Sequence, residues 1–327
     1  MLCSIVIPTR DRAEALASTL AAIDARCGAA LRLHGGEVIV ADNASAEPAR
    51  VPRLLPESGV PVRLLRIGEN MGAGARNLAA EAAAGEWLLM LDDDSAPRDG
   101  AFVELASRAP AETAAIGGEI FVTDGHGRVL HREFGGLPEV FVGCGALVRR
   151  AAFLAAGGYD AGFGFYAEEP DLCARLIGGG WRVAFSRGLR VDHAKSPAGR
   201  DRSLVVRRLT RNTALVAHRY TPDDRRNEAV EAVIARCRRI AEQQGVPEAA
   251  REGELEFRER AAAERPTPLS AEAFERFEGW AAVRRRLGAV HAVRPIERAR
   301  VLMPGGVIGK GSEVIEAVVR SLGAEVV

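Results

Sequence analysis

The chain has 327 residues, of which 47% are hydrophobic, and its 44 basic residues balance 44 acidic ones. This length allows one large domain or two modest ones with a proper core, and the zero net charge gives no global field that would attract nucleic acid or an anionic membrane. Five widely spaced cysteines without a CxxC pair argue against a disulfide framework and a zinc knuckle. No apolar run approaches the roughly 18 residues of a membrane span, and the N-terminus does not resemble a signal peptide, which favours a cytoplasmic protein.

The N-terminal third of the chain repeats one pattern, in which a short apolar run ends in polar residues and is followed by a helical stretch. The apolar runs at 4–10, 37–45, 62–67 and 86–91 predict four strands, and their alternation with helices is typical of a parallel sheet. Ligands bind such sheets at the carboxyl ends of the strands. We therefore expect a site among the polar residues at these ends, namely Thr9, Arg10, Asp42, Asn43, Glu69, Asn70, Asp92, Asp93 and Asp94.

Two helices of this region have recognisable starts. Asp11 and Glu14 have the spacing of a capping box, so Asp11 is predicted to cap a helix that follows the first strand. The glycines of ENMGAGARN, 69–77, predict a turn into an alanine-rich helix that Gly85 ends.

Three consecutive aspartates, Asp92–Asp94, follow the fourth strand. Adjacent carboxylates repel, and at a dielectric well below that of water each uncompensated pair costs on the order of a few kcal/mol. Mg²⁺ or Mn²⁺ would offset this charge, since such an ion takes carboxylate oxygens and keeps places for water and phosphate oxygens. A solvated turn or a helix N-terminus is the alternative interpretation, because acidic residues suit both.

The second half of the chain holds another acidic cluster, Glu168, Glu169 and Asp171, which opens a predicted helix. Asp171 and Arg175 are spaced i, i+4 and are interpreted as an ion pair, on the surface or buried, rather than as catalytic residues. A later strand, GLRVDHA, delivers His193. Taken alone, a histidine at a strand end is more often packed than a ligand.

A hairpin is predicted from Thr123 to Arg132, with DGHG at its tip, and its histidines are interpreted as structural or solvent-facing.

Six segments carry a resemblance to a known family through their composition and their order along the chain: SIVIPTRDR, VIVADNAS, ENMGAGARN, MLDDD, GGYDAGFGFYAEEPDLCARL and VDHAKS. Together they resemble a family 2 glycosyltransferase with the GT-A fold, in which MLDDD is the DxD motif. RRLTRNTALVAHRY, 207–220, resembles the arginine–asparagine helix that closes many bacterial members. The resemblance covers about residues 3–220. It implies an α/β fold, Rossmann-like, with a mixed, mostly parallel sheet and flanking helices.

The resemblance implies a metal-dependent enzyme that moves a hexosyl or deoxyhexosyl group from a nucleoside-diphosphate sugar, with UDP or dTDP favoured. The acceptor is a hydroxyl of a glycan, a lipid-linked or a small molecule. Asp94 and His193 would hold Mn²⁺ or Mg²⁺, Asp92 would contact the ribose or the metal, and Asp93 lies between the two aspartates. The segment EEPDLC and the 207–220 helix most resemble rhamnosyltransferase-like members, which favours a deoxysugar donor.

The general base is expected to be a carboxylate on the acceptor side of the anomeric carbon, and Glu169 is the candidate by resemblance. Many relatives carry a Glu-Asp pair where this chain has Glu168 and Glu169. The longer second side chain changes its reach and leaves Glu168 as a competitor, or as the residue that orients the acceptor. One carboxylate base and in-line displacement predict inversion at the anomeric carbon.

The resemblance also assigns donor binding to Pro8, Thr9, Arg10, Asp42, Asn70, Arg76, Asp92 and Asp93. Residues 8–10 would flank the base and ribose, and Asp42 would accept the imide N–H of uracil or thymine. Arg76 could fork onto a phosphate. Its alternative interpretation is an ordinary arginine on a helix surface.

The predicted division of the chain is a GT-A catalytic domain over 1–221, a helical C-terminal extension over 222–300 and a strand–helix–strand segment over 301–327. RPTP, 265–268, breaks the helical periodicity of the extension. The extension would pack on the catalytic domain, shape the acceptor site or mediate homodimers. The last segment either adds to the fold or begins a further Rossmann-like domain of a longer protein.

GVIGKGS near the C-terminus is not a phosphate loop, because Gly311 stands where Ser or Thr must follow Lys310.

Two other functions are alternatives to glycosyl transfer. A strand followed by DxD also occurs in haloacid-dehalogenase phosphatases, but Ser95 and Ala96 stand where such enzymes have threonine or valine soon after the aspartates. A non-catalytic subunit that binds a nucleotide sugar is the second alternative, in which the Glu-Glu pair marks lost catalysis.

Overall fold

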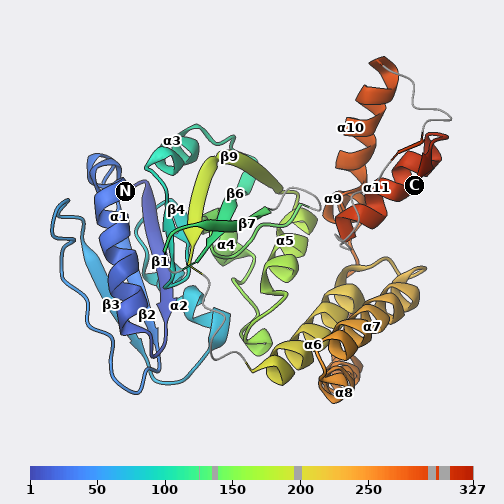
Figure 1. Cartoon of the computed structure of the whole chain (residues 1–327), viewed down its shortest axis with the longest axis horizontal. Helices are drawn as coiled ribbons and strands as arrows, with labels where there is room; N and C mark the ends of the chain where they lie inside the picture. Colours follow the sequence, from blue (N-terminus) through green and yellow to red (C-terminus); the bar gives the residue numbers. More distant parts are fainter. Residues whose placement is uncertain (125, 135–138, 195–200, 294–299, 302–309, 327) are drawn as a thin grey trace.

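The computed structural model describes residues 1–124, 126–134, 139–194, 201–293, 300–301 and 310–326. Its centre is a nine-stranded sheet in the order β3-β2-β1-β4-β8-β6-β9-β5, with β7 paired to β6, and helices lie on both faces (Figure 1). The strands of this sheet are β1 (Cys3–Thr9), β2 (Glu37–Asn43), β3 (Val62–Ile67), β4 (Trp87–Met90), β5 (Ser95–Pro97), β6 (Thr113–Thr123), β7 (Val129–Phe134), β8 (Ala146–Arg149) and β9 (Arg182–His193).

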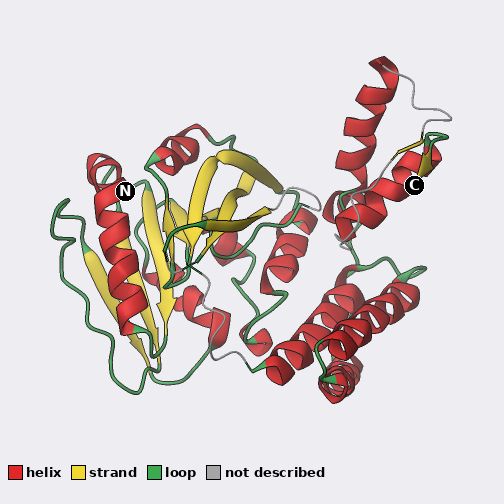
Figure 2. Cartoon of the chain, in the orientation of Figure 1, coloured by secondary structure: helices red, strands yellow, loops and turns green. Residues whose placement is uncertain are grey.

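Helices connect and cover these strands (Figure 2). Their bounds are α1 (Ala13–Leu33), η1 (Gly72–Gly74), α2 (Ala75–Ala82), α3 (Ala101–Arg108), α4 (Arg150–Ala155), η2 (Ala161–Phe163), α5 (Glu168–Gly178), α6 (Arg202–Tyr220), α7 (Arg226–Gln243), α8 (Pro247–Ala263), α9 (Ala271–Phe277), α10 (Trp280–Val293) and α11 (Lys310–Ser321).

The parallel half of the sheet consists of β3, β2, β1 and β4. Along β1, Ile5 and Ile7 pack on one face and Val6 on the other, and all three are fully buried. Strands buried on both faces read as continuous apolar runs, which is why the sequence predicts these four. Thr9 stands beside Asp42 in the register of β1 and β2, so the two strand ends meet at one edge of the sheet.

The other half of the sheet is mixed and positions the second set of polar residues. β8 is antiparallel to β4 and β6, β9 is parallel to β6, and β5 is antiparallel to β9. The aspartates are followed by the short strand β5, and not by the helix of the alternative interpretation. Because Ser95 pairs with His193, β5 brings the late histidine next to the acidic triplet. The predicted hairpin is confirmed as β6 and β7.

The predicted cap of the first helix is wrong. α1 begins after Arg12 and has no side-chain cap hydrogen bond. Asp11 instead adopts a left-handed backbone conformation, with φ 53°. Its carboxylate accepts a hydrogen bond from the Ala46 N–H at 2.7 Å, and its own N–H donates to Ser45 Oγ at 3.0 Å. Asp11 therefore ties the loop after β1 to the loop after β2.

The C-terminal part of the chain is mainly helical. RPTP, 265–268, lies between α8 and α9, as its composition predicts. The short strands β10 (Arg300–Val301) and β11 (Glu325–Val326) form a parallel pair of their own, and α10 packs on α11 through Val283 and Val318. The predicted glycine turn at 302–309 lies outside the described residues. None of the described helices has the length and apolar character that a membrane crossing requires.

Candidate active site

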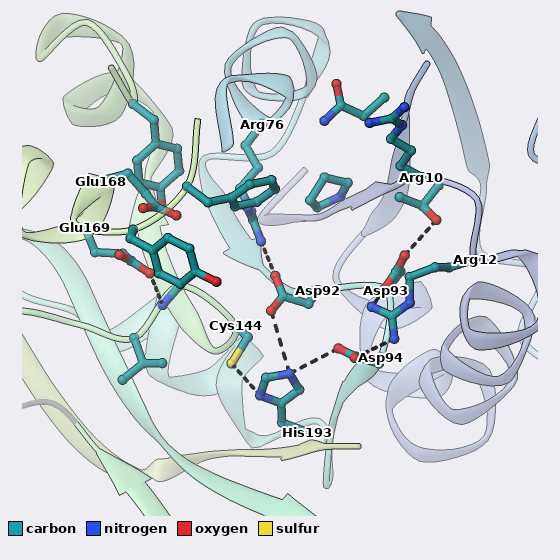
Figure 3. A pocket seen from close by; sticks show the side chains of 18 of the residues that line it. Arg10, Arg12, Arg76, Asp92, Asp93, Asp94, Cys144, Glu168, Glu169 and His193 are labelled. Carbon is teal, nitrogen blue, oxygen red and sulfur yellow. Dashed lines mark hydrogen bonds and ion pairs between the residues drawn. The ribbon is translucent and has the colours of Figure 1, made fainter. Parts of the chain in front are cut away.

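A cavity of about 580 Å³ opens at the carboxyl ends of the central strands (Figure 3). Its size is within the usual range of ligand sites. Its walls contain all of the predicted site residues except Asp42 and Glu69: Pro8, Thr9, Arg10, Asn43, Asn70, Arg76, Asp92, Asp93, Asp94, Glu168, Glu169 and His193. The walls also contain residues that the sequence did not predict, among them Arg12, Cys144, Tyr159, Phe165, Tyr166 and Leu209.

Arg12 binds two of the three aspartates. Its guanidinium nitrogens lie 2.7 Å from Asp93 Oδ1 and 2.7 Å from Asp94 Oδ2, and Thr9 donates its hydroxyl to Asp93 Oδ2 at 2.8 Å. Burial raises the pKa of Asp93 to about 6, although Arg12 and Thr9 favour its charged form. Arg12 belongs to the SIVIPTRDR motif, but only its position beside the strand ends shows this role.

Arg76 compensates Asp92. Its side chain is almost fully buried, pairs with the Asp92 carboxylate and donates to the Leu91 carbonyl at 3.0 Å. The alternative of an ordinary surface arginine is therefore wrong. The Nε atom of Arg76 is buried without a hydrogen-bond partner among the described residues.

His193 faces the aspartates with one ring nitrogen and a cysteine with the other. Its Nε2 lies 3.1 Å from Asp94 Oδ1 and 3.8 Å from Asp92 Oδ2, and its Nδ1 lies 3.3 Å from Cys144 Sγ. Burial disfavours the charge of Asp94, but His193 and Arg12 together hold its pKa below the usual value.

These residues fit a divalent cation. Asp94 Oδ1 is buried and faces His193 Nε2 at 3.1 Å, without the geometry of a full hydrogen bond. Potential ligand atoms of Asp92, Cys144 and His193 lie within 4.8 Å of one another. Carboxylate and imidazole donors suit Mn²⁺, and a second partner on the other ring nitrogen commonly fixes the orientation of a ligand histidine. Cys144 is this second partner, at the Nδ1 atom of His193.

Glu168 and Glu169 lie on a different wall of the cavity from the aspartates (Figure 3). They are the first residues of α5, as the sequence predicts. Glu169 Oε1 accepts the Gly143 N–H at 3.0 Å, whereas Glu168 Oε2 is buried without a hydrogen-bond partner among the described residues. Burial and the neighbouring Glu169 raise the pKa of Glu168 well above its usual value. Burial also raises the pKa of Glu169.

Asp42 is directed into the loop that follows β2. Its carboxylate accepts the N–H groups of Ser45 at 3.1 Å and Ala49 at 2.9 Å. It does not line the cavity, so contact with a nucleotide base would require these bonds to open. The next residue, Asn43, does line the cavity and donates to Asn70 Oδ1 at 3.1 Å.

Asp171 forms the predicted ion pair with Arg175, at 2.6 Å, and it is 1% exposed. It also binds Arg219 at 2.8 Å and accepts the Tyr220 hydroxyl at 2.8 Å. Both partners belong to α6, so Asp171 joins α5 to α6 and stays outside the cavity.

Residues 4–153 match the model of the family described as glycosyl transferase family 2. No curated protein sequence matches the chain.

Two solved structures share its fold. The mannosyltransferase PcManGT from Pyrobaculum calidifontis, in complex with GDP-Man and Mn²⁺, is 15% identical with a TM-score of 0.51, over 98% of this chain and 85% of that one. Residues 1–349 of S. aureus TarS, in complex with UDP-GlcNAc, are 12% identical with a TM-score of 0.54, over 98% of this chain and 91% of that one. At these identities the similarity shows the fold alone, and it confirms the predicted GT-A architecture.

Proposed function

We propose that the chain, whose residues 4–153 match the model of glycosyl transferase family 2, is a glycosyltransferase that uses a nucleoside-diphosphate sugar and a divalent metal ion. The observation that carries this proposal is the cavity itself. One wall presents the acidic triplet with His193, and another presents the pair Glu168 and Glu169. A cation site and a candidate base thus border one space at the strand ends, where such sheets bind ligands.

Asp94, Asp92 and His193 would hold Mn²⁺ or Mg²⁺. The close approach of His193 Nε2 to the buried Asp94 Oδ1, at 3.1 Å, supports this assignment, and the PcManGT complex contains Mn²⁺. When bound, the ion supplies positive charge that neutralises the departing diphosphate. Arg76, which pairs with Asp92, lines the same cavity.

Glu169 is the proposed general base for the acceptor hydroxyl. Its raised pKa brings proton uptake closer to the pH at which such enzymes work. The Gly143 N–H holds one of its oxygens and leaves the other available to the acceptor. Glu168 would orient the acceptor. Attack on the side opposite the diphosphate gives inversion at the anomeric carbon.

Residues 8–10, with Asn43 and Asn70, would bind the base and ribose, since they line the same end of the cavity. The UDP- or dTDP-linked deoxysugar favoured by the sequence motifs remains the proposed donor. PcManGT was solved with GDP-Man and TarS with UDP-GlcNAc, so both relatives of this fold support a nucleotide sugar and neither selects the base.

A thermal-shift panel tests this function. The purified chain is heated with Mn²⁺ and, in turn, UDP-glucose, UDP-GlcNAc, GDP-mannose and dTDP-rhamnose. A donor present at 100 times its Kd stabilises the native state by about 2.7 kcal/mol, so one nucleotide class should raise Tm, and only with the metal. An equal Tm with every nucleotide, with and without Mn²⁺, would contradict the proposal.

A further inference from the structure

The loop that leads into α5 has an unusual backbone. Gly164, Tyr166 and Ala167 have φ values of 69°, 73° and 65°. Tyr166 and Ala167 carry side chains, for which the left-handed region is sparsely populated and costs on the order of 1 kcal/mol or more each. Glu168 and Glu169 follow directly. The direction of both carboxylates therefore depends on a conformation that the loop does not favour by itself.

Asn212 of α6 holds this loop. Its Nδ2 donates to the carbonyl oxygens of Phe163 at 3.1 Å, Phe165 at 2.9 Å and Tyr166 at 2.7 Å. Asn212 is 0% exposed, so bulk water does not compete with its amide for these carbonyl oxygens. The neighbouring Arg211 adds a bond to the Phe163 carbonyl at 2.9 Å.

The opposite side of the loop contacts the glycine-rich turn. The Ala73 N–H donates to the Gly164 carbonyl at 2.5 Å. Gly72 has a φ of 57°, and a Cβ there would lie 2.2 Å from the Gly164 oxygen. The loop is thus held between the turn before α2 and the side chain of Asn212.

We propose that Asn212 is a positioning residue for Glu168 and Glu169, and that α6 is thereby part of the catalytic machinery although it lies outside the residues that match the family. This inference rests on the proposed function of the glutamate pair. Its physical basis is one amide group that binds three carbonyl oxygens, of Phe163, Phe165 and Tyr166, in a strained loop. Loss of that group lets the loop relax and moves the carboxylates away from the acceptor.

The chain offers a matched control on the same helix. Thr210 is also 0% exposed, but its hydroxyl donates to the Val206 carbonyl at 2.8 Å, within α6. Thr210→Ala removes a buried polar group of α6 without touching the loop. A difference between Asn212→Ala and Thr210→Ala therefore reports on the loop and not on the packing of the helix.

The experiment compares kcat, donor affinity, Tm and amide hydrogen exchange at 163–169 in wild type, Asn212→Ala and Thr210→Ala, with the nucleotide sugar that the thermal-shift panel selects. Asn212→Ala should lower kcat by roughly 10²-fold, the effect of misplacing a reacting group by about 1 Å, with unchanged donor affinity and faster exchange at 163–169. Thr210→Ala should keep both kcat and the exchange of wild type.

Equal losses in the two variants, or full kcat in Asn212→Ala, would overturn the inference. If Asn212→Ala does not fold, Asn212→Asp tests the inference instead, because aspartate keeps the shape of the side chain and has at most one donor hydrogen. An unchanged kcat in Asn212→Asp would also overturn the inference. If wild type turns over no donor, the proposed function fails instead. Exchange at 163–169 then still tests the positioning, and equal rates in all three proteins would refute it.

Discussion

The cavity has two acidic walls, which differ in how the negative charge of their carboxylates is compensated. On the first, each aspartate has a cationic partner: Arg76 for Asp92, and Arg12 for Asp93 and Asp94. On the second, Glu168 and Glu169 stand side by side, and burial raises the pKa of both. His193 and Arg12 keep the pKa of Asp94 below its usual value, which suits a cation, whereas burial of the glutamate pair favours proton uptake. In the proposed function, this difference separates metal binding from proton transfer within one cavity.

The largest effect is expected at the first wall. Asp94→Asn removes a charge from the proposed metal site, so turnover and metal-dependent donor binding should fall to background. The fold should persist, because the change relieves repulsion among the aspartates. Asp223→Asn, at an exposed position on the surface, is the control. Full activity of the Asp94 variant would remove this residue from the metal site.

At the second wall, Glu169→Gln keeps the volume and removes proton acceptance. We expect kcat to fall by roughly 10²- to 10⁴-fold, with donor affinity near that of wild type. Glu168→Gln should instead raise the acceptor KM. Steady-state kinetics with varied acceptor would show exchanged roles if the 168 variant lost kcat and the 169 variant kept it.

A smaller effect on metal binding is expected at Cys144, which contacts His193 of the first wall from behind. Cys144→Ala removes the partner of His193 Nδ1, and loss of such a partner typically lowers metal affinity by about 10- to 100-fold. Mn²⁺ titration followed by electron paramagnetic resonance measures this. Cys173→Ala, also in the core but outside the cavity, should bind Mn²⁺ as wild type does. Equal affinities in both variants would assign Cys144 to packing alone.

The smallest effect concerns stability. Between the ordinary and the raised pKa of Glu168, the native state holds a proton that the unfolded state has lost, so stability falls as pH rises through that window. Glu168→Gln removes this loss and should be more stable than wild type above the window. Urea unfolding at pH 5 and pH 8 tests the sign, with the exposed Glu259→Gln as control. A less stable 168 variant at pH 8 would show that the carboxylate is charged and satisfied.

The strand–helix rhythm and the strand-end residues were predictable, because a buried parallel strand is visible as an apolar run and its polar end follows in sequence. The place of His193 beside Asp94 was not predictable from spacing. It depends on the pairing of β5 with β9. Because β5 has only three residues, its sequence pattern is too short to predict a strand.

Arg12, Cys144 and Asn212 were missed as site or positioning residues for the same reason. Each acts through partners that are distant in the chain: Arg12 and Asp94, for example, are 82 positions apart. Asp42 shows the converse: the sequence placed it at the correct strand end but could not show that its oxygens bind the following loop. The predicted boundaries at 221 and 300 remain predictions.

The central claim is metal-dependent transfer from a nucleotide sugar, and donor cleavage tests it most directly. The chain is incubated with UDP-glucose, UDP-GlcNAc, GDP-mannose or dTDP-rhamnose, with Mn²⁺ or with EDTA, and released nucleoside diphosphate is quantified. We predict slow release from one donor, only with Mn²⁺, lost in Asp94→Asn and slowed in Glu169→Gln. Saturable donor binding without any release, or metal-independent release of inorganic phosphate, would contradict the account.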